Sequence, residues 1–246
     1  MRGVARFLKN LVRPEPLAPM VINASGTSLP VVFRKNANAR RLVLRFSRDM
    51  SEVRVTIPHR VSRNDAMAFV NKSQGWIEKQ LAKTEAQRDD PSRILFRGEE
   101  YELVYTGELR GLIWIDQLQA RILVPGDKAH APRRLADWMA REAKRELTEA
   151  SHRRAAEMGV KVSRVSVRDQ KSRWGSCSSS GDLSYSWRLI MAPPQVLDYV
   201  VVHEAAHLRH MNHGAAYWRL VLKHCPDAAE AKDWLKANGG KLHRML

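Results

Sequence analysis

The sequence has few cysteines and no long apolar run. Its two cysteines, Cys177 and Cys225, are too few for a disulfide framework and are typical of a reducing compartment. No stretch approaches the roughly 18 consecutive apolar residues that a membrane-spanning helix requires. The first 14 residues also lack the apolar core of about 7–15 residues that a secretory signal contains. We therefore expect a soluble, cytoplasmic protein without a transmembrane segment.

Acidic residues are scarce relative to basic ones. The 246 residues include 26 Asp and Glu against 42 Lys and Arg, which gives a net charge of +16. Residues 16–48 contain six basic residues and no acidic one, whereas residues 141–175 contain ten basic and five acidic residues. This balance suggests nucleic acid or an anionic membrane surface as a partner, but no helix-turn-helix, zinc-finger or RNA-binding signature accompanies it. Charge alone therefore predicts at most weak, non-specific nucleic-acid binding.

Composition divides the chain into three parts. Residues 1–19 form a basic amphipathic segment whose first 13 residues have helical spacing and could lie on a membrane surface or dock on the domain. Residues 20–128 are rich in predicted strands, and residues 129–246 are mostly helical. Hydrophobic residues make up 44% of the chain, enough for a buried core. The expected fold class is α+β, and no internal repeat is visible.

Periodicity and turn residues predict the individual elements. Strands are expected at 31–33, 42–44, 53–57, 94–96, 101–105, 112–115, 121–124, 162–167 and 183–190. Helices are expected from Ser62 to about residue 88, and at 132–158, 194–210, 215–224 and 227–237. Residues 171–182 read as a polar loop between two strands.

Residues 203–207, His-Glu-Ala-Ala-His, have the spacing of two metal ligands and a neighbouring base. On a helix, His203 and His207 project from one face about 5–6 Å apart, as two ligands of one metal require. Glu204 lies about 100° around the helix, where it can take a proton from a metal-bound water. Chance produces this pattern in about one such sequence in fifty, so the match alone is not decisive. The apolar run at 199–202 adds weight, because it predicts that the helix is buried.

A catalytic zinc needs a third protein ligand and an open fourth position. The candidates are His210, His213, His224, Cys225 and Cys177, and the last could also supply a fourth ligand. On an unbroken helix His210 lies about 10.5 Å along the axis from His203, too far for one ion. His213 stands between Asn212 and Gly214, which tolerate turn conformations, so the chain can fold back to present it. We choose His213.

The spacing of these three histidines matches that of metzincins, but His210 replaces their turn glycine and no Met-turn follows. Three flanking segments make a better match, and together they resemble the YgjP-type, SprT-related zinc metallopeptidases: residues 169–178 (DQKSRWGSCS), 183–190 (LSYSWRLI) and 212–218 (NHGAAYW). The resemblance implies a zincin-like domain, Zn²⁺ held by His203, His207 and His213, Glu204 as the catalytic base, and a protein or peptide substrate. Ala205 and Ser186 depart from the residues usual in that family, which are leucine and asparagine.

Other residues near the motif have two interpretations each. Residues 183–190 are either an edge strand that pairs with an extended substrate or an ordinary core strand. Residues 174–177 are either a tight turn with a packed indole or a wall of the cleft. For Tyr217 and Trp218 we favour core packing over an oxyanion role.

A second functional hypothesis is a nucleic-acid-associated protein with a structural zinc site. Such a site is closed by four protein ligands, whereas a catalytic site leaves one position open. Glu204 has no necessary role in a closed site. The sequence therefore favours the peptidase.

Overall fold

The computed structural model describes residues 20–47, 49–85, 90–108, 110–170 and 172–246. The amphipathic segment predicted at residues 1–19 lies outside the described residues. The described chain divides into two compact units, one of residues 20–46 and 51–81 and one made mainly of residues 82–246. No helix of the described residues combines the length and the apolar character that a membrane crossing requires.

The first unit is a four-stranded sheet with two helices. Its elements are β1 (Met20–Ala24), β2 (Thr27–Lys35), β3 (Val43–Phe46), β4 (Val53–Ile57), α1 (Arg63–Lys72) and α2 (Gln74–Glu85). Alternate residues of the strands pack with Ala66, Val70 and Ile77 of the helices in one hydrophobic core. The sequence predicted a single helix from Ser62, and Ser62 does cap α1 by accepting a hydrogen bond from the Asp65 amide at 3.1 Å. The helix is interrupted at Ser73, however, whose hydroxyl donates to the Phe69 carbonyl.

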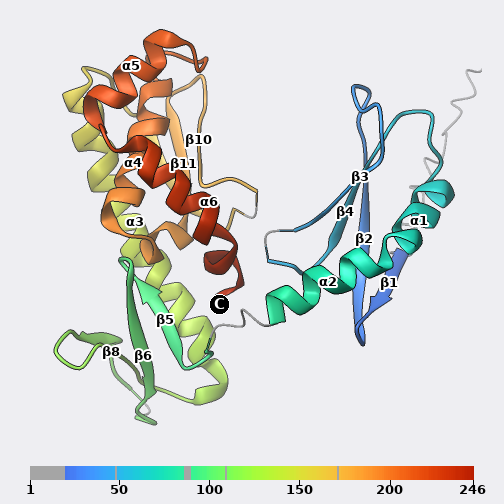
Figure 1. Cartoon of the computed structure of the whole chain (residues 1–246). Coiled ribbons are helices and arrows are strands. Elements are labelled where there is room, and N and C mark those ends of the chain that lie inside the picture. The colour runs from blue at the N-terminus through green and yellow to red at the C-terminus, as the bar shows by residue number, and fades with distance from the viewer. Residues whose placement is uncertain (1–19, 48, 86–89, 109, 171) are drawn as a thin grey trace, which may run out of the picture. The chain divides into compact units, whose positions relative to one another are not determined.

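The second unit contains two sheets and the remaining helices (Figure 1). Its strands are β5 (Arg93–Phe96), β6 (Glu99–Tyr105), β7 (Trp114–Asp116), β8 (Arg121–Val124), β9 (Arg164–Arg168), β10 (Gly175–Cys177) and β11 (Asp182–Ser186). Its helices are α3 (Ala131–Glu157), α4 (Pro194–His207), α5 (Ala215–His224) and α6 (Ala228–Arg244), with short 3₁₀ turns η1 (Lys128–His130) and η2 (Trp187–Met191). The combination of these helices with mixed sheets makes the fold α+β.

The first two sheets have the same topology, a structural repeat that the sequence pattern did not reveal. Their orders are β1-β2-β4-β3 and β5-β6-β8-β7, and in each the two inner strands are parallel and both outer pairs antiparallel. The opening hairpins both turn through two residues with positive φ, Ser25-Gly26 and Arg97-Gly98. This is the turn geometry that fits the right-handed twist of paired strands.

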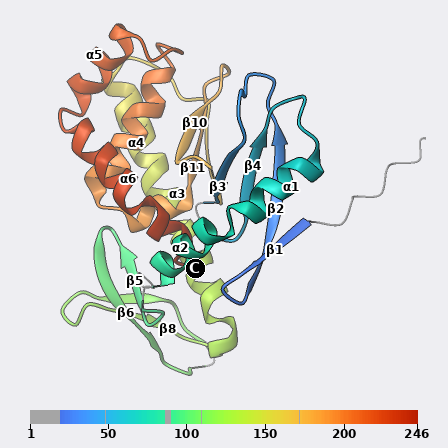
Figure 2. The same cartoon turned by 45° about the vertical axis from the view of Figure 1, so that its right-hand side comes forward.

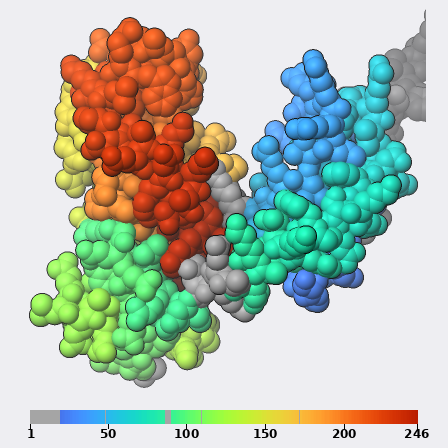
Figure 3. Space-filling model, in the orientation of Figure 1, coloured from blue at the N-terminus to red at the C-terminus, as the bar shows by residue number. Residues whose placement is uncertain are grey.

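The β5–β8 sheet belongs to the same core as the C-terminal helices. Its buried residues, such as Ile94 and Ile122, pack in one hydrophobic cluster with residues of α3 and α4. At its hairpin turn the Arg97 and Gly98 amides donate to the Ile190 and Met191 carbonyls at 2.8 and 3.0 Å. Figures 2 and 3 show this sheet and the helices as one continuous body. The boundary predicted near residue 128 therefore falls inside the second unit, and the structural division lies near residue 81.

The third sheet decides between the two interpretations of residues 183–190 in favour of a core strand, which ends at Ser186. Its order is β10-β11-β9, so β11 is the central strand, and residues 187–191 form the 3₁₀ turn η2. The edge strand beside α4 is β10, within the predicted polar loop. The loop prediction for residues 171–182 was wrong here, because Gly175–Cys177 is too short and too polar to show a strand period and gains its partner only through the hairpin to β11.

The C-terminal helix continues beyond its predicted end at residue 237. Gly239 and Gly240 lie inside α6, and an added Cβ at Gly239 would stand 3.0 Å from the Trp174 ring. The buried Arg188 side chain fixes the end of α6 by donating to the Leu242, Met245 and Leu246 carbonyls. The conformational freedom of glycine suggested that the helix ends before Gly239. The structure instead keeps both glycines within α6, with Gly239 packed closely against the Trp174 ring.

Candidate metal centre

Helix α4 positions the first two candidate ligands and the candidate base. It begins at Pro194, whose fixed φ suits a first helical position, and ends at His207, three residues before the predicted end. Most of its residues are buried, as the apolar run predicted. His203 and His207 share one face, and Glu204 lies on the neighbouring, buried face beside β10.

The chain turns after α4 and returns His213 to the other two histidines. One ligand nitrogen from each of His203, His207 and His213 lies within 4.8 Å of the others, and among the described residues these three form the only such group. The Nε2 atoms of His203 and His213 are 3.3 Å apart. Two nitrogens bound tetrahedrally at about 2.0–2.1 Å from one zinc ion stand about 3.3–3.4 Å apart, so this pair already has the required separation.

Neighbouring groups hold the imidazoles in orientations suited to a metal. Nδ1 of His207 lies 3.2 Å from the His210 carbonyl oxygen, to which it can donate, leaving Nε2 free for a metal. The Tyr217 hydroxyl donates to the His203 carbonyl at 2.9 Å, and its buried ring lies 4.7 Å from both the His207 and the His213 rings. His210 thus contributes its backbone, and Tyr217 packs against the site, as favoured from the sequence.

Burial favours the neutral form of two of these imidazoles, His203 and His207. Desolvation, followed by the neighbouring His207 and His213, lowers the pKa of His203 to about 4. Desolvation also lowers the pKa of His207. Because only a neutral imidazole has a free lone pair for a metal, these two side chains suit metal binding at neutral pH without first losing protons.

Glu204 is buried against a glycine. Its side chain is 7% exposed, and desolvation raises its pKa to about 7, with Arg173 acting in the opposite direction. An ideal Cβ on Gly175 would stand 2.6 Å from Glu204 Cγ and Oε1. Only a residue without a side chain fits there. Gly175 and Arg173 were missed as site residues, although the Trp-Gly-Ser-Cys run had suggested a cleft wall.

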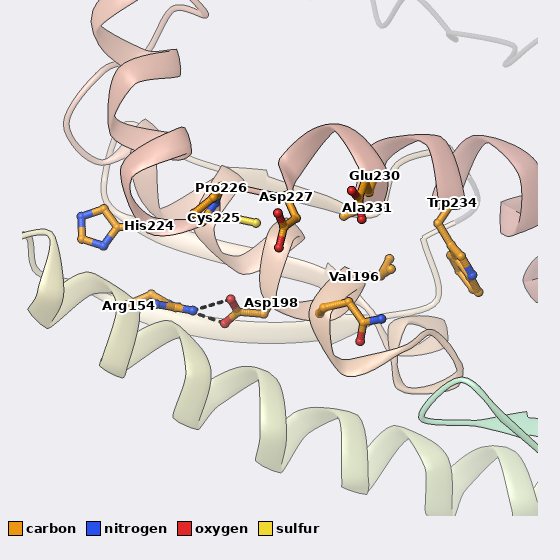
Figure 4. A pocket seen from close by; sticks show the side chains of 11 residues that line it. Arg154, Val196, Asp198, His224, Cys225, Pro226, Asp227, Glu230, Ala231 and Trp234 are labelled. Carbon is orange, nitrogen blue, oxygen red and sulfur yellow. Dashed lines mark hydrogen bonds and ion pairs between the residues drawn. The ribbon is translucent and has the colours of Figure 1, made fainter.

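The remaining sequence candidates lie outside the histidine group. Cys177 donates from Sγ to the Ser178 carbonyl, and burial together with Glu204 and Asp182 raises its thiol pKa to about 11. His224 and Cys225 line a separate cavity of about 450 Å³, in which Arg154 forms a two-pronged ion pair with Asp198 at 3.0 and 2.6 Å (Figure 4). Of the five candidates for the third ligand, only His213 therefore lies with His203 and His207.

Comparisons with known proteins identify a family that covers most of the chain. A family model described as the YgjP-like metallopeptidase domain matches residues 40–238. No curated protein sequence matches the chain. The solved structure of the metallopeptidase zymogen abylysin from Pyrococcus abyssi is 21% identical, with a TM-score of 0.35, over 41% of this chain and 99% of that chain.

Proposed function

The chain belongs to the YgjP-like metallopeptidase family, and from that premise we propose that it is a zinc-dependent peptidase with His203, His207 and His213 as ligands and Glu204 as base. The observation that carries the proposal is the grouping of three imidazoles beside one buried carboxylate. Three protein ligands and no fourth are typical of a catalytic zinc site.

Each residue has a distinct task. Bound Zn²⁺ supplies Lewis acidity, which polarises a carbonyl and makes water more acidic. Glu204 accepts the proton of the attacking water, and a carboxylate whose pKa lies near 7 is suited to both accept and return a proton at neutral pH. Gly175 leaves room for that carboxylate, and the His210 carbonyl orients His207.

We assign substrate binding to β10 and not to residues 183–190, for which an edge strand was one of two interpretations. Among the described residues β10 pairs with β11 on one side only, and it lies beside α4. An extended peptide can add to such an edge through backbone hydrogen bonds, which places it next to the strand that packs against α4.

The alternative, a closed structural zinc site in a nucleic-acid-associated protein, has less support. Within the part of the chain that the structure describes, no fourth histidine, cysteine or carboxylate joins the group. A buried carboxylate next to the ligands also has no role in a closed site.

The test compares metal content and hydrolysis in the Glu204→Gln variant. Gln preserves the size of the side chain but cannot accept a proton, so the variant should keep one zinc per chain and lose about 10²–10⁴-fold in the rate of hydrolysis of unfolded casein. A zinc-loaded variant that cleaves as fast as the parent would contradict the assignment of the base.

A further inference from the structure

We propose that the outer face of the β10-β11-β9 sheet is a subsite for acidic side chains, so that the enzyme selects peptides with Asp or Glu at alternate residues. The inference rests on the proposed peptidase function and on the assignment of β10 as the substrate-binding edge. It adds the substrate class, which neither the motif nor the family match specifies.

The outer face is polar and uniformly arranged. Cross-strand pairing aligns Ser166 of β9, Ser184 of β11 and Ser176 of β10 in one row, because Ser184 pairs with both of the others. The next row on the opposite face contains Val165 and Leu183, which are buried in the core. Since side chains alternate between faces, the serine row points away from the core.

Three arginines surround the serine row. Together with the serines, Arg164, Arg168 and Arg173 line a concavity of about 500 Å³. Arg164 is paired with Asp182 at 3.2 Å. Arg168 and Arg173 are exposed, and within the described ranges neither forms an ion pair with a carboxylate. The concavity therefore offers two exposed guanidinium groups and several hydroxyl donors, which is the chemistry that a carboxylate requires, and the Arg173 charge also acts on Glu204.

The free edge of β10 connects this concavity to the metal centre. Trp174 and Ser178 bond to β11, through the Ser186 amide to the Trp174 carbonyl at 2.8 Å and the Ser178 amide to the Asp182 carbonyl at 2.9 Å. In an antiparallel ladder the residues between bonded pairs direct their amide and carbonyl groups outward. Gly175 and Cys177 therefore present the hydrogen-bonding groups that an added peptide strand would use.

Successive side chains of such a peptide point alternately to the Glu204 side and to the outer face of the sheet. The residue opposite Gly175 points to the Glu204 side, because Gly175 faces Glu204. The peptide residues immediately before and after it point to the outer face, next to Ser176 and Arg173. Arg168 and Arg164 line the concavity from β9, on the far side of the sheet from the β10 edge. Acidic residues are therefore favoured at every second peptide position, namely at those whose side chains point to the outer face.

The experiment measures binding of labelled ten-residue peptides to the zinc-loaded, full-length Glu204→Gln chain by fluorescence anisotropy. Three peptides share a Thr/Val framework, with two Glu at positions i and i+2, two Glu at i and i+1, or two Gln at i and i+2. The i, i+2 Glu peptide should bind most tightly. Arg168→Glu and Arg173→Glu together should weaken it about 5- to 30-fold, since each reversal replaces an exposed attraction by a repulsion.

Controls separate this subsite from general charge effects. Arg168→Glu alone should leave the Gln peptide within about twofold and should improve binding of a Lys peptide with i, i+2 spacing. Arg141→Glu, an exposed arginine on α3, should leave the preference for the Glu peptide intact. Equal affinity for the i, i+2 Glu and Gln peptides, or a loss in Arg141→Glu as large as in the double variant, would overturn the proposal.

The peptidase assignment is tested separately by cleavage of the Gln peptide with the parent chain. Cleavage without an acidic preference refutes the subsite and leaves the peptidase standing. An acidic preference in binding without cleavage of any peptide refutes the peptidase and leaves an acidic-peptide site on β10.

Discussion

Replacing Gly175 by alanine tests the closest contact of the candidate site. The added Cβ would stand 2.6 Å from Glu204 Cγ and Oε1 and 2.9 Å from Cδ. Carbon atoms in contact are normally about 3.5–4.0 Å apart, so β10 or the carboxylate must move by about 1 Å. The contact involves the middle of the Glu204 side chain, which cannot swing away as a flexible tip would. Gly175 does not have a positive φ, so alanine brings a steric conflict and no backbone strain.

A displacement of about 1 Å at a catalytic group costs on the order of 10²-fold in rate. Overpacking of a core contact costs about 1–3 kcal/mol of stability. Gly175→Ala should therefore keep its zinc, unfold at a lower temperature and lose about 10²-fold in kcat/KM on unfolded casein. Metal analysis, thermal unfolding and initial rates measure the three quantities.

The matched control is Gly75→Ala, because Gly75 lies in α2 with nothing within 4 Å of an added Cβ. It should raise stability by about 0.5–1 kcal/mol, as expected for glycine to alanine in a helix, and leave kcat/KM unchanged. If Gly175→Ala retains kcat/KM within about threefold of the parent, the positioning of Glu204 by β10 is not what supports activity.

Three further predictions concern other parts of the chain. His213→Ala should lose zinc on dialysis far more severely than His210→Ala, because only His213 brings a ring nitrogen to the group; equal losses in metal analysis would contradict the ligand set. Arg188→Ala should lower the free energy of unfolding by about 2–4 kcal/mol in urea titrations, because it leaves the buried carbonyls at the end of α6 without a donor; the exposed Arg219→Ala is the control, and equal stability of the two variants would show that Arg188 does not anchor α6. DNA should bind weakly and with a steep salt dependence, mainly through the first unit, where residues 20–46 and 51–81 carry ten basic and three acidic residues, a net of +7; a mobility-shift titration at low salt that detects no complex at micromolar protein would refute it.

Local sequence rules were sufficient for the centre of the site. The i, i+4 spacing of His203 and His207 places both rings on one helix face in any fold that keeps this segment helical. The choice of His213 over His210 followed from helix rise and from the turn residues Asn212 and Gly214, and the structure brings His213 to the other two. The Ser62 cap of α1 and the extent of α3 also agree with prediction, because they depend on contacts between residues close in sequence.

Tertiary structure decided what depends on residues far apart in the chain. The edge strand is β10 and not β11, because β9, which precedes the β10–β11 hairpin in the chain, pairs in parallel with the other side of β11. The β5–β8 sheet joins the second unit through amides of Arg97 and Gly98 that bond to η2, a contact between residues about 90 positions apart that composition cannot reveal. Gly175 is required by the Glu204 side chain, and Gly239 by the Trp174 ring. The sequence by itself therefore determined which groups could hold a metal and accept a proton, since that chemistry is local. Packing between distant segments determined which strand edge and which glycine lie beside them, because those positions follow from the arrangement of the whole core.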